Sequence, residues 1–226
     1  MIITIDGPAG SGKSSVARKL AKKIRFTFFD SGAMYRALTY FIMENKIHYN
    51  DEQELEKALK NFSYRVDFSE EEEVHFIHKK NVNREIRSIE VTNKVSEISA
   101  LVPVRKALIS LQRNYAKNTD AVFEGRDMGS TVFPNAELKI FLSADPNVRA
   151  QRRLLEMQEK NPEKAKKVSL EEIYDNIVMR DHLDSTRAYS PLRQAEDSYF
   201  IDTSHLSMKE VVDKIVEYKN QSYSSL

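Results

Sequence analysis

The sequence contains no cysteine. This absence excludes disulfides, thiolate metal sites and cysteine nucleophiles together, so any metal would be bound by oxygen. The sequence also has no apolar run that approaches the roughly 20 residues needed to cross a bilayer. Because an expected strand starts at the second residue and runs directly into a glycine-rich loop, there is no room for a secretion signal. We therefore expect a cytoplasmic protein that does not associate with membranes.

Neither sign of charge dominates the sequence. Lysine and arginine number 35 against 34 acidic residues, so no global basic field favours nucleic acid or a membrane surface. Hydrophobic residues make up 41% and charged residues 31%, which is typical of a globular protein with a polar surface. A chain of 226 residues falls between one large domain and two small ones, and one domain with insertions fits best. Any anion must therefore be bound locally.

The strongest motif runs from Gly7 to Ser14 and matches G-x-x-x-x-G-K-[ST] without a gap. The β-branched run Ile2–Ile5 precedes it and apolar residues at helical spacing follow it, which is the strand, loop and helix start that the motif requires. Such a loop selects polyphosphate: Lys13 reaches the β- and γ-phosphates, and the Ser14 hydroxyl holds Mg²⁺. A glycine turn that merely precedes a helix is the alternative. The expected nucleotide-binding residues are Gly7, Pro8, Ala9, Gly10, Ser11, Gly12, Lys13, Ser14 and Ser15.

Strand patterns alternate with helix patterns along most of the chain. This alternation predicts the α/β class, with a parallel sheet of five strands and helices on both faces. The expected strands are Ile2–Ile5, Phe26–Phe29, Ala121–Phe123, Leu138–Leu142 and Ser198–Asp202. Helix-start pairs are expected at Asn50 with Gln53, Ser169 with Glu172, and Ser207 with Glu210. Two helices are expected to meet near Pro103.

One segment departs from this alternation. Residues Tyr64–Phe68 alternate between apolar and charged, and Val74 and Phe76 continue the alternation, which predicts an inserted antiparallel hairpin. The acidic run Glu70–Glu73 between them is interpreted as a solvated turn. The histidines have no metal-ligand spacing and are expected at the surface, including His75, His78 and His205.

Arginines gather at the expected strand ends and around a polar stretch at 159–167, which is interpreted as a flap between two helices. The stretch Glu124–Asp127 leaves a strand at its carboxyl end, where open α/β sheets bind ligands. Each arginine taken singly also fits an ordinary surface ion pair. Phosphoryl transfer, however, needs positive charge placed around phosphate oxygens, and a flap that excludes water favours a small-molecule kinase over a plain NTPase.

The sequence closely resembles the bacterial-type cytidylate kinases, which phosphorylate CMP and dCMP with ATP. The resemblance covers nearly the whole chain and is carried by the stretches Ile5–Lys13, Asp30–Arg36, Glu124–Gly129, Arg180–Asp181 and Arg187 with Pro191–Leu192. It implies a single P-loop kinase domain. Its core would comprise 1–31, 119–148 and 190–226, its NMP-binding region with the hairpin insert 32–118, and its lid 149–189. One departure is Arg25, which stands where many relatives end the first helix with glycine.

The resemblance also implies roles for individual residues. It implies that the CMP phosphate is held by Arg36, Arg126 and Arg187. It implies that Ser96, Arg105 and Asp127 face cytosine, that Ser31 lines the same pocket, and that Arg180 and Asp184 approach the sugar. Arg149 and Arg153 resemble lid arginines that close on ATP. The expected catalytic residues are Lys13, Arg126, Arg187, Arg149 and Arg153.

These observations predict transfer of the ATP γ-phosphoryl group to CMP or dCMP, with ATP and Mg²⁺ as cofactors and without a covalent enzyme intermediate. We expect a monomer with no nucleic-acid partner. A kinase for another mononucleotide or a small metabolite remains an alternative, because the phosphate machinery alone does not read the acceptor. A nucleotide-gated switch is an alternative from a different class.

Overall fold

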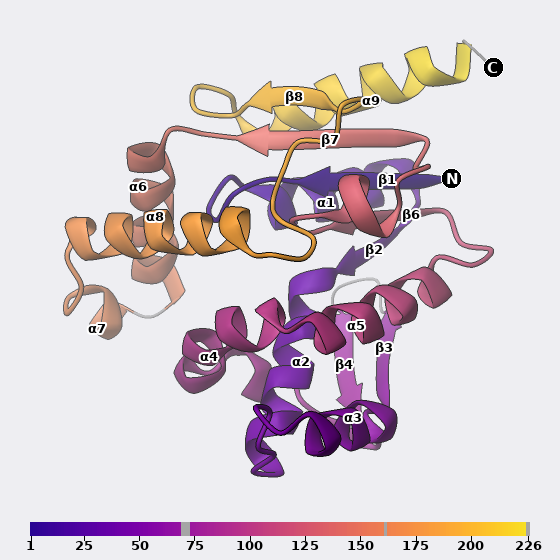
Figure 1. Cartoon of the computed structure of the whole chain (residues 1–226). Helices are drawn as coiled ribbons and strands as arrows, with labels where there is room; N and C mark the ends of the chain where they lie inside the picture. Colours follow the sequence, from indigo (N-terminus) through magenta and orange to yellow (C-terminus); the bar gives the residue numbers. More distant parts are fainter. Residues whose placement is uncertain (69–72, 161, 225–226) are drawn as a thin grey trace. The chain divides into compact units, whose positions relative to one another are not determined.

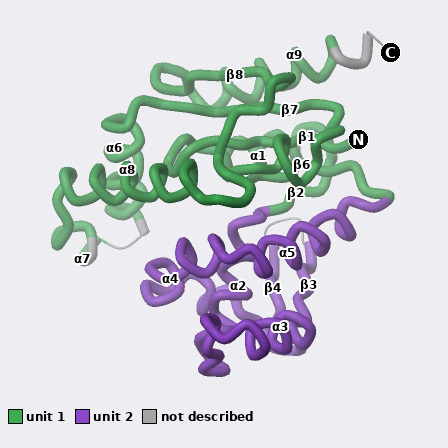
Figure 2. The backbone as a smooth tube through the Cα atoms, viewed as in Figure 1, with its two compact units in different colours: residues 1–29, 118–226 green, residues 30–117 purple. Residues whose placement is uncertain are grey.

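A computed structural model describes residues 1–68, 73–160 and 162–224 (Figure 1). The chain divides into two compact units (Figure 2): Met1–Phe29 with Asn118–Leu226 form unit 1, and Asp30–Lys117 form unit 2. These limits lie within a few residues of the expected NMP-binding region. The assignment of core, NMP-binding region and lid stays a prediction.

Unit 1 is built on a five-stranded sheet with the order β2-β6-β1-β7-β8. Its strands are β1 (Ile2–Asp6), β2 (Thr27–Asp30), β6 (Ala121–Glu124), β7 (Leu138–Ser143) and β8 (Tyr199–Asp202). Strand β1 pairs in parallel with β6 and β7, and β7 pairs in parallel with β8. The predicted α/β fold and its strands are therefore confirmed. After β1 the chain first adds β2 and β6 on one side of β1, and then β7 and β8 on the other side. The carboxyl end of β1 is therefore a topological switch point, where such sheets bind ligands.

The core of unit 1 lies where α1 (Lys13–Ile24) and α9 (Met208–Ser224) pack on the sheet. Ile3 and Ile5 on one face of β1 and Thr4 on the other are fully buried, as expected for a strand covered on both faces. Strand β7 leads directly into α6 (Pro146–Lys160), which with α8 (Leu170–Thr186) lies at the carboxyl ends of β1 and β7 (Figure 1). The sheet thus presents its carboxyl edge to these two helices.

Two of the three expected helix-start pairs are confirmed. Ser169 and Glu172 form a reciprocal capping box before α8, and Ser207 and Glu210 exchange the same bonds before α9. The third is wrong by one residue. Helix α3 (Glu52–Asn61) is capped by Asp51, whose carboxylate accepts from Glu54 N–H, and not by the Asn50 and Gln53 pair. A carboxylate at this position also meets the positive end of the helix, which an asparagine amide cannot match.

Unit 2 joins helices to a small sheet of its own. The helices are α2 (Ser31–Glu44), α3, α4 (Ile89–Ala100) and α5 (Val102–Tyr115), with a 3₁₀ turn at Glu85–Arg87. The sheet has the antiparallel order β3 (Tyr64–Phe68), β4 (Glu73–Ile77) and β5 (Lys80–Asn81). The hairpin and the meeting of two helices beside Pro103 are confirmed. The short strand β5 was not predicted.

The buried face of the second hairpin strand carries two polar residues. Glu73, His75 and Ile77 are buried, whereas Val74 and Phe76 are half-buried. The register explains this, because β4 residues lie opposite the buried residues of β3: His75 pairs with Val66, and Ile77 with Tyr64. His75 is therefore an exception to the expected surface position of the histidines, and its Nδ1 lies 2.7 Å from the Tyr64 hydroxyl.

Two polar stretches are also revised. In the acidic run Glu70–Glu73, Glu73 belongs to a strand and is buried, while residues 70–72 lie outside the described residues. In the stretch 159–167, α6 continues to Lys160 and α7 (Pro162–Ala165) follows, so the described part is largely helical. Its action as a flap stays a prediction. Within the three described ranges, no helix has both the length and the apolarity needed to cross a membrane.

The residue after α1 yields a stability prediction. Arg25 has a φ of 60° and donates its backbone N–H to the Ala21 carbonyl. Since an L-residue with a side chain is disfavoured in this left-handed region, Arg25→Gly should raise the free energy of unfolding by about 1 kcal/mol. Lys19→Gly, at an exposed position inside the same helix, should instead lower it by about 1 kcal/mol. Urea denaturation of both variants tests this, and equal losses would show that the left-handed conformation carries no cost.

Candidate functional site

The glycine loop passes from β1 to α1 along the carboxyl edge of the sheet. Gly7 has a φ of 148°, and a Cβ there would lie 2.0 Å from the Leu142 carbonyl oxygen, so only glycine allows the loop to pass β7 this closely. Gly12 has a φ of 88° and directly precedes the first residue of α1. The amides of the first turn of a helix are available to an anion, which the helix dipole also favours. The predicted phosphate loop therefore has the required geometry.

Lys13 is buried beneath this loop with 5% of its surface exposed. Its amine donates to the Pro8 carbonyl at 2.7 Å and to the Ser11 hydroxyl at 3.4 Å. Burial, together with the nearby charges of Arg126 and Arg180, lowers the pKa of Lys13 to about 7 against the opposing effect of carboxylates. A polyphosphate bound to the loop would therefore favour the protonated, positively charged form of the Lys13 amine.

The next residue of the motif contacts the neighbouring strand. Ser14 donates its hydroxyl to Glu124 Oε1 at 2.8 Å, and Glu124 ends β6 with 5% exposure. A hydroxyl and a carboxylate beside a phosphate loop are the oxygen donors that suit Mg²⁺, which also keeps waters and phosphate oxygens as ligands. Among the residues that the structure describes, no three His, Cys, Asp or Glu side chains group as a metal cage. These two residues therefore fit a magnesium ion shared with a nucleotide.

A second carboxylate joins the loop strand to the segment after β6. Asp6, the last residue of β1, accepts from the backbone amides of Met128 at 2.8 Å and Gly129 at 2.7 Å. Burial raises the pKa of Asp6 to about 7, although these two amides oppose the change. The bonds fix the start of a π-helical turn, Met128–Val132, directly after Asp127. Asp6 thereby sets where Arg126 and Asp127 leave the sheet.

Arginine and aspartate side chains form a cluster beside this turn. Arg126 Nε donates to Asp184 at 2.8 Å, and Arg187 pairs with Asp184 at 3.6 Å and with Asp127 at 3.3 Å. Burial opposes the charge of Arg126, but the carboxylates of Asp184 and Glu124 outweigh it and raise the pKa of Arg126. Burial likewise opposes the charge of Asp184, but Arg126 and Arg180 outweigh it and lower the pKa of Asp184. The structure therefore brings the predicted Arg126, Asp127, Arg180, Asp184 and Arg187 together.

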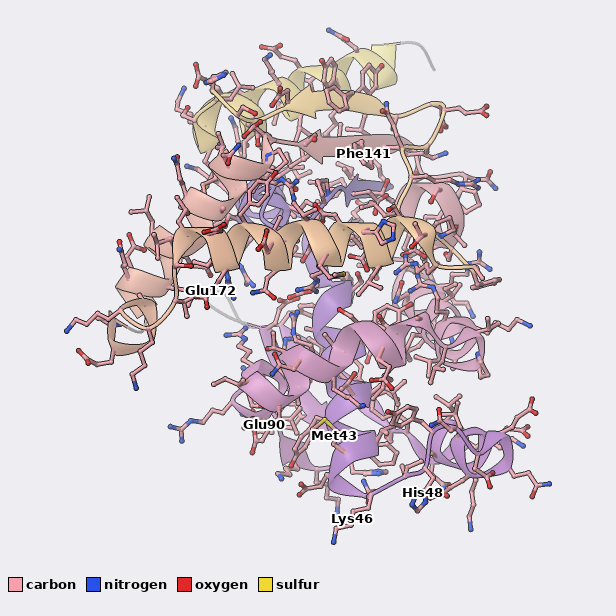
Figure 3. All side chains as sticks on the ribbon, turned by 60° about the vertical axis from the view of Figure 1, so that its left-hand side comes forward. Met43, Lys46, His48, Glu90, Phe141 and Glu172 are labelled. Atoms are coloured by element: carbon pink, nitrogen blue, oxygen red, sulfur yellow. The ribbon has the colours of Figure 1, made fainter. Side chains whose placement is uncertain are left out.

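The two expected lid arginines differ in their surroundings. Arg149 is buried, and its guanidinium donates to the Ala144 carbonyl at 2.9 Å, the Ala9 carbonyl at 2.8 Å and Asp181 at 2.5 Å. Asp181 also accepts from the Ala9 amide at 2.8 Å. Arg153 is exposed and pairs with Glu156 at 2.7 Å. Arg149 and Asp181 thus connect α6 and α8 to the predicted phosphate loop. The side chains of α8, including the labelled Glu172, are drawn in Figure 3.

Unit 2 carries the remaining predicted residues. Ser31 is buried at the first position of α2, and Arg36 on the same helix donates to Asp30 at 3.1 Å. Arg105 on α5 is 1% exposed, with its guanidinium 5.1 Å from the centre of the Tyr35 ring. It also donates to the Ser99 carbonyl at 3.2 Å, one turn after the half-buried Ser96 on α4. Within this unit, Ser96 and Arg105 lie close to the same turn of α4.

Three residues with clear roles in the site were not singled out from the sequence. Glu124 and Asp6 could have been found, because each is a carboxylate at the carboxyl end of a predicted strand. Asp181 is part of a recognised stretch, but nothing in the sequence indicates that it contacts Ala9, 172 residues away. Long-range partners of this kind require the fold.

The buried amine yields a pH prediction. Since phosphate charge should raise the pKa of Lys13 from about 7, ATP binding at about pH 8 should take up close to one proton. ATP affinity should accordingly fall as the pH rises from about 7 to 9. Calorimetry in two buffers of different ionisation enthalpy measures the uptake, with Lys19→Met as a matched control that retains it. The same uptake in Lys13→Met would assign the proton to another group.

Several known proteins are similar to this chain. A family model described as cytidylate kinase matches residues 3–221. A cytidylate kinase of Protochlamydia amoebophila is 51% identical over 220 residues, covering 97% of this chain and 96% of that protein. One of Carboxydothermus hydrogenoformans is 44% identical over 217 residues, covering 96% of each. An uncharacterized protein from Eubacterium ventriosum, 14% identical, shares the fold with a TM-score of 0.53 over 98% of both chains. The length of the family match and the identity to these relatives show that the chain belongs to the cytidylate kinase family.

Proposed function

We propose that this protein transfers the γ-phosphoryl group of ATP to CMP, giving ADP and CDP. The observation that carries the proposal is the pairing, within unit 1, of two cationic groups at one edge of the sheet. Lys13 serves the glycine loop, and Arg126 and Arg187 form the cluster beside it, close enough for the charge of Arg126 to act on Lys13. A plain NTPase or a switch needs only the first group, whereas a kinase with a phosphorylated acceptor needs both.

In this reaction an oxygen of the CMP phosphate attacks the γ-phosphorus of ATP, and the bond from that phosphorus to the β–γ bridging oxygen breaks. The electron pair leaves with ADP, so no covalent intermediate with the protein is required. Lys13 and the two arginines stabilise the negative charge spread over the phosphate oxygens. The buried loop and the contacts of Arg149 and Asp181 that fasten helices to it keep the donor oriented.

We propose Ser14 and Glu124 as the residues that hold Mg²⁺, Ser14 directly and Glu124 through its bond to Ser14 or through water. When bound, the ion supplies positive charge to the donor phosphates and helps to orient them. Glu124 also stabilises the charge of Arg126, so it serves both groups of cations.

We propose that the acceptor is read by the residues that the family resemblance implies. Arg36, Arg126 and Arg187 would hold the phosphate, and Ser31, Ser96, Arg105 and Asp127 the cytosine. Arg180 and Asp184 would approach the sugar, and dCMP would also be accepted. Arg153, which is exposed, keeps its proposed contact with ATP, whereas the buried contacts of Arg149 favour a role in fixing the loop. A monomer is proposed as well, and sedimentation at assay concentration tests it.

The decisive experiment mixes the purified protein with ATP, Mg²⁺ and each mononucleotide in turn, and identifies the products by chromatography. We expect CDP and dCDP to form much faster than any other diphosphate. Equal use of another mononucleotide would favour the first alternative, a kinase with a different acceptor. Nucleotide binding without transfer to any acceptor would favour the switch.

The base contact yields a further prediction. Cytosine offers its N4 amino group as a donor, whereas uracil presents the O4 lone pairs, which a carboxylate repels. Asp127→Asn should therefore lower the ratio of kcat/KM for CMP over UMP by roughly tenfold to a hundredfold, mainly by weakening CMP. Asp175→Asn on the exposed side of α8 is the control that should change neither constant. An unchanged ratio in Asp127→Asn would show that this carboxylate does not read the base.

The metal proposal has its own test. Glu124→Gln keeps the size of the side chain but removes its charge, so it should raise the Mg²⁺ concentration for half-maximal rate by roughly tenfold. Glu217→Gln, on the exposed face of α9, should leave that concentration unchanged. The measurement is the initial rate against free Mg²⁺ at a fixed concentration of ATP. The same Mg²⁺ dependence in Glu124→Gln and the parent protein would remove Glu124 from the metal site.

A further inference from the structure

Asp127 occupies a position from which its carboxylate would ordinarily cap the following turn. It directly precedes Met128–Val132, and an aspartate there normally accepts from amides of the next few residues. Here the carboxylate of Asp6 accepts from the amides of Met128 and Gly129 instead. The Asp127 carboxylate consequently turns to side-chain donors, and the identity of those donors decides its orientation.

Two of these donors come from one short segment that follows α8. The Ser190 hydroxyl donates to Asp127 Oδ2, and Arg187 pairs with Asp127 Oδ1 at 3.3 Å. The same arginine donates its Nε to the Ser190 carbonyl at 2.5 Å, which joins the two donors to each other. Asp127 is 2% exposed and Ser190 is 7% exposed, so these contacts are shielded from water. Each oxygen of the Asp127 carboxylate is therefore contacted by a side chain from residues 187–190.

The backbone of Ser190 indicates that its side chain matters. Ser190 has a φ of 57°, a left-handed conformation that is costly for a residue with a side chain and that glycine adopts without this cost. A hydroxyl that donates to a buried carboxylate is a specific reason to hold a serine in this conformation. The left-handed backbone and the hydrogen bond to Asp127 both indicate that the Ser190 hydroxyl has a specific role.

We propose that Ser190 is a positioning residue for base recognition, which holds the Asp127 carboxylate so that it can accept only from the N4 amino group of cytosine. This inference rests on the proposed function. An ionised carboxylate accepts at about four lone-pair positions, so the bonds from Ser190 and Arg187 do not by themselves exhaust its capacity to accept. With the hydroxyl in place the carboxylate cannot rotate away from uracil O4, and the repulsion of UMP is retained.

The test compares Ser190→Ala and Ser190→Gly with the parent protein, with kcat and KM measured separately for CMP and UMP. Both variants lose the hydroxyl, but only glycine relieves the left-handed backbone. We expect both to lower the ratio of kcat/KM for CMP over UMP by roughly tenfold, through a higher KM for CMP with kcat little changed. Ser185→Ala is the matched control, because that exposed hydroxyl donates only to the nearby His182 carbonyl.

Two results would overturn the inference. An unchanged CMP to UMP ratio in both variants would show that the hydroxyl does not orient Asp127. A ratio that falls in Ser190→Ala and recovers in Ser190→Gly would assign the effect to backbone strain. Failure of the proposed function is distinguishable, because the parent protein itself would then show no preference for CMP.

Discussion

The site depends on the burial of one positive charge. The Lys13 amine lies under the glycine loop and donates to two neutral acceptors, the Pro8 carbonyl and the Ser11 hydroxyl. An ammonium group in this position is costly, which is why burial lowers its pKa to about 7. Turning Pro8 and Ser11 inward requires a tightly wound loop, and the left-handed glycines provide it. The loop is thus shaped around a charge that only a phosphate fully stabilises.

Carboxylates at the ends of two paired strands connect this loop to the acceptor side. Asp6 ends β1 and binds the turn after β6, while Glu124 ends β6 and binds Ser14 after the glycine loop. Because Ile5 lies opposite Glu124 in the parallel register, these contacts run in opposite directions across the same strand pair. A shift of either strand would move the donor site and Arg126 together, so the two phosphate-binding groups are held in one geometry.

Local patterns predicted the parts of this arrangement that depend on neighbours in sequence. The G-x-x-x-x-G-K-S spacing, the five strands and the capping boxes at Ser169 and Ser207 are properties of short segments, and the structure has them. The buried face of β4 could not be predicted in this way, because cross-strand register, not the apolarity of Val74 and Phe76, decides it. Contacts such as Ser190 with Asp127 join residues 63 positions apart, and no local pattern encodes them.

The pairing of Arg126 and Arg187 with one carboxylate would have a consequence for the proposed catalysis. Arg126 and Arg187 share Asp184, so their charge is partly neutralised by the protein itself. A phosphate group must compete with that carboxylate, and it does so best when its own negative charge is greatest. Phosphoryl transfer conserves the total charge but redistributes it among the attacking, transferring and leaving oxygens. If the two arginines contact the oxygens that gain charge, they would compete with Asp184 more effectively at the transition state than in the ground state. The buried ion pairs would then lower ground-state affinity more than transition-state affinity, while adding little to stability themselves.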